Sequence, residues 1–281
     1  MRIKITADST CDLPQEIIRR YDIAIIPLLI LKNNVVYKDG LEITVENIFD
    51  YVESGSGMTQ SSAINVSDYH EYFSKYASGN DAVIHINISN HLSACYQNAR
   101  IAAEDFDNVF VVDSHNLSTG SGHIVLDAAI MAEQGKTPQE IVKELDRLTP
   151  LVEASFVIGT LKYLHKGGRC SGIAALGANL LKLNPCIEVI DGKMEVGKKY
   201  RGTFEKIILQ YVYDKLAGRD DVDGRRIFIT YPPGLSDTIV SSVIERIKSI
   251  RHFDEIINCK AGCVISNHCG PICLGILFYR I

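Results

Sequence analysis

The sequence contains no tryptophan and no long, uninterrupted hydrophobic run. Its longest strongly apolar run covers residues 23–31, and Pro27 interrupts it. A helix that crosses a bilayer needs about 20 apolar residues, so this run is too short. The first seven residues alternate charged and apolar side chains and lack the apolar stretch of a signal peptide. We therefore expect a cytoplasmic protein with no membrane span.

The chain also lacks an excess of basic residues and a dense set of cysteines. Its 29 basic and 34 acidic residues give a net charge of −5, which predicts no general affinity for nucleic acid. Eight cysteines in 281 residues are too few for a secreted disulfide scaffold, so we expect free thiols. Five possible metal ligands crowd the end of the chain, but their C-x3-C spacing is not that of a zinc ribbon: Cys259, Cys263, His268, Cys269 and Cys273. We expect no metal and no cofactor.

No catalytic motif is complete. Gly135-Lys136-Thr137 resembles the end of a phosphate-binding loop, but Ile130 stands where that loop requires glycine. Gly120-Ser121-Gly122 begins a dinucleotide fingerprint, but Val125 replaces its third glycine. Neither a zinc-protease motif nor a nucleophile elbow occurs. These absences favour a binding protein over an enzyme.

The order of the predicted elements indicates an α/β protein with two domains. At about 150 residues per domain, 281 residues suggest two. Before Pro150, strands and helices alternate, which predicts a parallel sheet sandwiched by helices. After Pro150, a hairpin signal at Asp191-Gly192 and several terminal strands predict a second α/β domain with a mixed sheet. We place the domains at residues 1–150 and 151–281.

Four local patterns give more specific predictions. The sequence Asp12-Leu13-Pro14-Gln15 is typical of a helix start, with Asp12 as the cap. Residues 23–31 are expected to form one buried strand, and residues 263–266 another. A helix is expected over residues 173–183.

Small hydroxyl-bearing residues recur at the ends of the predicted strands, at 8–10, 89–93 and 113–114. Thr59-Gln60-Ser61-Ser62 adds more of them on a loop that leads to a helix. Ligands of open α/β sheets bind at the carboxyl ends of strands. Backbone N–H groups and hydroxyls there suit a carboxylate or a phosphate, although each residue singly is also explained by helix capping. The cluster predicts an anion-binding site.

These motifs, in this order, resemble those of the DegV family of bacterial fatty-acid-binding proteins, the acyl-carrier subunits of fatty acid kinase. The resemblance runs through nearly the whole chain. It rests on the segments 8–14 (DSTCDLP), 59–62, 88–97, 112–114, 166–171, 191–192 and 268–271, together with Arg201.

The resemblance implies a DegV-like two-domain fold with a long-chain fatty acid buried between the domains. Thr59 and Ser93 match the family residues that hold the carboxyl group, and Ser61 lies in the loop of Thr59. Arg169 and His268 match residues near the head group. The family's partner is an ATP-dependent kinase that phosphorylates this carboxyl group.

Arg201 matches a position on the surface that faces the kinase. The chain departs from the family motifs at Gln60-Ser61-Ser62, which replaces S-Q-P, and at Ala94-Cys95, which replaces Gly-Thr. Ile272 also replaces the second glycine of G-P-G. The alternative to a carrier is an enzyme or a sensor that acts on a small phosphorylated or hydroxylated metabolite.

Overall fold

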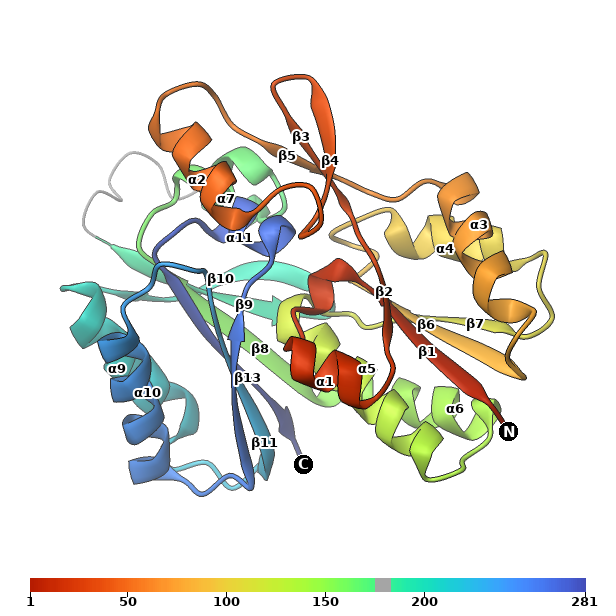
Figure 1. The fold of residues 1–281 in the computed structure, drawn as a ribbon. Coiled ribbons are helices and arrows are strands. Elements are labelled where there is room, and N and C mark those ends of the chain that lie inside the picture. Colours follow the sequence, from red (N-terminus) through yellow and green to blue (C-terminus); the bar gives the residue numbers. More distant parts are fainter. Residues whose placement is uncertain (175–182) are drawn as a thin grey trace.

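A computed structural model of the chain describes residues 1–174 and 183–281. It contains two large β-sheets, and the helix α5 (Ser118–Glu133) lies between them and contacts strands of both (Figure 1). Among the described helices, none is long and apolar enough to cross a membrane.

The first sheet is entirely parallel, with the strand order β2-β1-β6-β7. Its central strand β6 is buried along its whole length, as expected for a parallel strand covered on both faces. The helices α3 and α4 pack on one face, and α5 and α6 on the other (Figure 1). The strands are β1 (Ile3–Asp8), β2 (Ala24–Ile26), β6 (Ala82–Asn87) and β7 (Val109–Asp113), and the remaining helices are α1 (Gln15–Arg20), α3 (Val66–Ala77), α4 (Cys95–Ala103) and α6 (Pro138–Leu148). The predicted helix-covered parallel sheet is confirmed.

The second sheet is mixed, with the order β10-β9-β8-β13-β11-β12. Only β11 and β12 pair in parallel in this sheet. Asp191 and Gly192 both have positive φ, as the tight β9–β10 hairpin requires. The elements are β8 (Val152–Ile158), β9 (Asn184–Ile190), β10 (Lys193–Tyr200), β11 (Val222–Tyr231), β12 (Glu255–Lys260) and β13 (Cys273–Arg280), with α9 (Phe204–Leu216) and α10 (Asp237–Ile250) on the face away from α5. The predicted mixed sheet is therefore also confirmed.

A group of shorter elements covers one end of the two sheets (Figure 1). A small antiparallel sheet, β4-β3-β5, lies there beside α11 (Cys263–Cys269), and α2 and α7 also pack against α11. The other elements of this group are β3 (Leu29–Lys32), β4 (Val35–Lys38), β5 (Gln60–Ser62), α2 (Val45–Glu53), α7 (Lys162–Gly167) and α8 (Ser171–Ala174).

The helix α5 is buried on almost every side, as a helix between two sheets must be. Several of its polar side chains bond to strands of the second sheet. The Thr119 and Thr230 hydroxyl oxygens are 2.6 Å apart, and Asp127 Oδ1 lies 3.0 Å from an Arg226 guanidinium nitrogen. We propose a domain boundary near Pro150, because the first sheet ends at Asp113 and the second begins at Val152.

The predicted role of Asp12 is wrong. The residue before α1 is Pro14, which makes no side-chain capping bond, and Asp12 adopts a left-handed conformation with φ of 50°. Its carboxylate turns away from α1 and accepts hydrogen bonds from Ser118 and Gly262, which are distant in the sequence. Local spacing therefore identified a capping residue but assigned it to the wrong helix.

Two further local predictions are corrected. The apolar run 23–31 forms two strands, β2 and β3, separated at Pro27, which cannot donate a backbone hydrogen bond. Residues 263–266 belong to the helix α11 and not to a strand. Of the helix predicted over 173–183, residues 175–182 lie outside the described part of the chain.

The buried ion pair between α5 and β11 predicts a measurable loss of stability. Replacing Asp127 by Ala leaves the Arg226 charge in a site where both side chains are more than nine-tenths buried. We expect Asp127→Ala to lower the free energy of unfolding by about 3 kcal/mol in urea denaturation. The double variant Asp127→Ala with Arg226→Met should lose less unfolding free energy than Asp127→Ala alone, because no unpaired charge stays buried. An equal or larger loss would contradict the assigned ion pair.

Candidate functional site

A cavity of about 270 Å³ opens at the end of the molecule that the short elements cover. Residues from both halves of the chain line it, so it lies between the two sheets and under β5 and α11. Its walls are mainly apolar, and their larger side chains are Leu28, Ile88, Leu92, Leu117, Phe156, Leu164, Met194, Val264, Ile265 and Leu277. Such a cavity favours a ligand with a substantial apolar portion.

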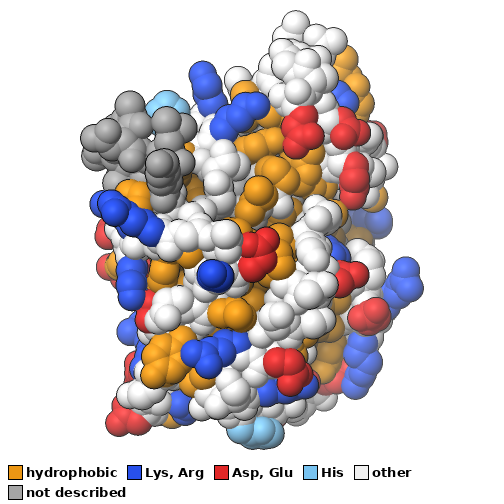
Figure 2. All heavy atoms as spheres, turned by 90° about the vertical axis from the view of Figure 1, so that its left-hand side faces the viewer, with side chains coloured by type: hydrophobic (Ala, Val, Ile, Leu, Met, Phe, Trp, Pro, Cys, Tyr) orange, Lys and Arg blue, Asp and Glu red, His pale blue; other side chains and the backbone are white. Residues whose placement is uncertain are grey.

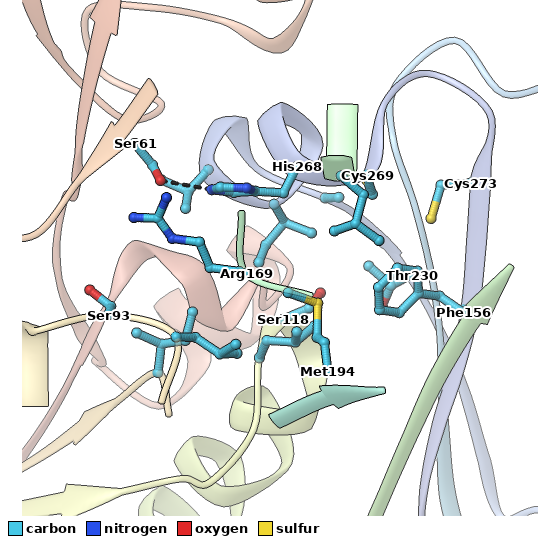
Figure 3. Close-up of a pocket in the computed structure, with 18 of the residues that line it drawn as sticks. Ser61, Ser93, Ser118, Phe156, Arg169, Met194, Thr230, His268, Cys269 and Cys273 are labelled. Carbon is cyan, nitrogen blue, oxygen red and sulfur yellow. Dashed lines mark hydrogen bonds between the residues drawn. The ribbon is translucent and has the colours of Figure 1, made fainter. Parts of the chain in front are cut away.

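Four of the predicted site residues line one side of this cavity: Ser61, Ser93, Arg169 and His268 (Figure 3). The Ser61 hydroxyl and His268 Nε2 are 2.8 Å apart. Ser61 comes from β5 and Ser93 from the loop before α4, whereas Arg169 follows α7 and His268 lies on α11. The structure thus brings together residues that are up to 207 positions apart in the sequence.

The backbone of the Ser93 loop is held by Ser89. The N–H groups of Leu92 and Ser93 both donate to the Ser89 carbonyl oxygen, and the Ser89 hydroxyl donates to the Gly192 carbonyl oxygen at 2.7 Å. The hairpin tip of the second sheet therefore steadies a loop of the first half. Among the described residues, the Ser93 hydroxyl donates only to the Cys95 sulfur, at 3.2 Å. This weak contact leaves it able to donate to a ligand oxygen.

Gly167 explains part of the K-G-G-R motif. A Cβ atom at this position would lie 2.2 Å from His268 Nδ1, so only glycine allows the imidazole to pack there. The Gly167 carbonyl oxygen also accepts a 2.7 Å hydrogen bond from Arg169. One glycine thus sets the positions of both head-group candidates, the imidazole and the guanidinium.

His268 is a neutral imidazole in this setting. Burial lowers its pKa to about 4, and the nearby positive charge of Arg169 acts in the same direction. Its Nδ1 atom is buried and has no hydrogen-bond partner among the described residues. The fixed positive charge on this side of the cavity therefore comes from Arg169.

Thr59 is placed differently from the other predicted residues. It is buried and its hydroxyl donates to Asn267 Oδ1, so it links the start of β5 to α11 and is not among the residues that line the cavity. The sequence analysis missed Asn267, because the only signal that could have found it is its position next to His268. It also missed the more distant cavity hydroxyls of Ser118, Ser155 and Thr230.

Arg201 lies outside the cavity, on the exposed connection between β10 and α9.

Figure 2 shows one face of the molecule, on which basic and acidic side chains are interspersed. The described residues of this face form no extended basic field of the kind that binds nucleic acid.

The described residues offer no metal site. Within 1–174 and 183–281, no three His, Cys, Asp or Glu side chains are grouped so that they could hold an ion. All eight cysteines are free and buried, and Cys269 and Cys273 line the cavity. The cavity instead combines a cationic and hydroxyl-bearing side with apolar walls, an arrangement that suits an amphipathic anion.

Comparison with known proteins identifies the family of the chain. The family model for DegV, described as an uncharacterised protein family, matches residues 2–280. A protein of Thermotoga maritima named "Fatty acid-binding protein" is 30% identical over 293 aligned positions, which cover 98% of this chain and 96% of the relative. The chain therefore belongs to the DegV family.

Solved structures show the same fold. A DegV family protein from Thermus thermophilus, described by its fatty acid binding, has 30% sequence identity and a TM-score of 0.89, with each chain covered in full. A DegV lipid-binding protein from Thermotoga maritima has 26% identity and a TM-score of 0.88, covering 100% of this chain and 99% of its own. The DegV-like α/β fold expected from the motifs is thereby confirmed.

The packing at Gly167 can be tested directly. We expect Gly167→Ala to displace the His268 imidazole and to weaken ligand binding by about tenfold, because overpacking of this kind costs about 1–3 kcal/mol. Binding is measured by displacement of a fluorescent amphipathic anion from the cavity. Gly79→Ala is the matched control, since a Cβ there meets nothing within 4 Å. Equal binding by the two variants would contradict the assigned packing.

Proposed function

We propose that this protein binds one long-chain fatty acid in the cavity, with the carboxyl group beside Ser61, Ser93, Arg169 and His268. The single observation that supports this most strongly is the division of the cavity into a polar side, with the fixed positive charge of Arg169, and extended apolar walls. The names of related DegV proteins, which describe fatty acid or lipid binding, support the same ligand class.

The energetics are favourable for such a ligand. Each methylene group removed from water contributes about 0.8 kcal/mol, so a long acyl chain supplies the main driving force. A carboxylate taken from water requires hydrogen bonds or a counter-charge. The Ser93 hydroxyl and the Arg169 guanidinium supply both, and His268 and Ser61 add polar atoms beside them.

We further propose that the protein is a carrier without catalytic activity of its own. It presents the carboxyl group to an ATP-dependent fatty acid kinase, which converts that group to an acyl phosphate. Arg201 is exposed, as a residue on the kinase-facing surface must be. The carrier works in the cytoplasm and uses no cofactor besides its bound fatty acid.

Native mass spectrometry of the purified protein tests ligand binding. We expect a single non-covalent adduct with the mass of one fatty acid, present on purification or formed after addition of palmitic acid, because the cavity holds one chain. A protein that carries no adduct and takes up no fatty acid would contradict the proposal. Turnover of a nucleotide by the isolated protein would instead support the enzyme alternative.

A second test addresses the carboxyl site. Ser93→Ala removes a hydroxyl donor on the cavity wall, and Thr59→Ala frees Asn267 and loosens β5 from α11. We expect the double variant to bind palmitic acid more than about tenfold more weakly in fluorescent-ligand displacement. Ser242→Ala, on the exposed face of α10, serves as the control. Unchanged affinity in the double variant would place the head group elsewhere.

A further inference from the structure

Two buried carboxylates of the first half of the chain lie at the start of α11. The Gly262 N–H donates to Asp12 Oδ1 at 2.8 Å, and the Cys263 N–H donates to Asp39 Oδ1 at 3.0 Å. Asp12 is 8% exposed and Asp39 is 5% exposed. These contacts join residues 250 and 224 positions apart. The fatty acid site described above uses neither carboxylate directly.

We propose that Asp12 and Asp39 are positioning residues that hold α11, and through it His268, at the head-group side of the cavity. This inference rests on the proposed fatty-acid-binding function. It assigns a role to Asp12, which lies in the DSTCDLP segment and does not cap its own helix.

The start of α11 needs acceptors from outside the helix. The first N–H groups of any helix lack partners within it, and here the capping position is Gly262, which has no side chain to supply one. A Cβ at position 262 would approach Asp12 Oδ1 to 3.1 Å, so the glycine leaves room for the carboxylate that replaces a local cap.

The other oxygen of each carboxylate is anchored to the first half of the chain. Asp12 Oδ2 accepts from the Ser118 hydroxyl at 2.6 Å, at the beginning of α5. Asp39 Oδ2 accepts from the Ser9 hydroxyl at 2.7 Å, and Ser9 in turn accepts from the Leu28 N–H at 3.0 Å. Each carboxyl group thus joins the start of α11 to the first half of the chain through its two oxygens, as a positioning role requires.

The far end of the same short helix carries the site. Asn267 accepts from Thr59, and His268 contacts Ser61, while Val264 and Ile265 form part of the apolar wall. Because α11 has only seven residues, a displacement at Gly262 is transmitted to the imidazole. Loss of either carboxylate should therefore disturb the contacts of His268.

Burial raises the pKa of Asp12 to about 8, so its carboxyl group is largely protonated at neutral pH. The protonated form still accepts from Gly262 through Oδ1 and can donate to Ser118. Asparagine offers the same pair of groups. Asp12→Asn should therefore bind fatty acid nearly as well as the wild-type protein, whereas Asp12→Ala should bind about tenfold more weakly.

A double-mutant cycle tests whether Asp39 acts through His268. Palmitic acid affinity is measured for Asp39→Ala, His268→Ala and the double variant. We expect about a tenfold loss in each single variant and no more than about a threefold further loss when the two are combined, because coupled residues are not additive. Additive losses, or no loss in Asp39→Ala, would overturn the proposal.

Asp127→Ala is the matched control, since Asp127 is also a buried carboxylate that joins the two halves but it contacts Arg226 and not α11. The loss of palmitic acid affinity in Asp127→Ala should simply add to the loss in His268→Ala. The NMR signal of the His268 ring should move in Asp39→Ala, or in Asp39→Leu, which offers no acceptor, if the alanine variant does not fold. The signal should stay in place in Asp127→Ala. An unmoved signal would overturn the positioning role, whereas a wild-type protein that binds no fatty acid would overturn the proposed function.

Discussion

The burial of α5 between the two sheets is the constraint on which the rest of the structure depends. Its residues follow the last strand of the first sheet, yet Thr119, His123 and Asp127 make hydrogen bonds or ion pairs to strands of the second sheet. These polar contacts are almost fully buried, so they form only when both sheets are in place. This helix therefore holds the two halves against each other, and its first residue, Ser118, lines the cavity between them.

The site at the end of α5 depends on contacts that each half of the chain makes with the other. The hairpin tip at Gly192 steadies the loop of Ser93, and the carboxylates of Asp12 and Asp39 lie at the start of the helix that carries His268. Residues of each half therefore hydrogen-bond to the segment of the other half that carries a polar group of the site. A head group bound there would contact both halves, and the apolar walls between them would enclose the chain of the ligand.

Much of the fold could be predicted from the sequence, because its causes are local. Alternating strands and helices before Pro150 indicated a covered parallel sheet, and Asp191-Gly192 indicated a hairpin. The structure forms this hairpin with positive φ at both residues. The prediction failed at residues 263–266, where a short apolar run fits a strand or a helix equally well. It also failed at Asp12, since a capping pattern does not state which helix the carboxylate will meet.

The sequence by itself determined most of the elements, the α/β class and, through its motifs, the resemblance to the DegV family. Only the tertiary structure decided which polar residues share a cavity. It placed Ser61 beside His268 and turned Thr59 toward Asn267, although Thr59 and Ser61 are separated by a single residue. The reason is physical: the contacts of a side chain depend on how elements far apart in the chain pack together, and the local sequence spacing does not specify that packing.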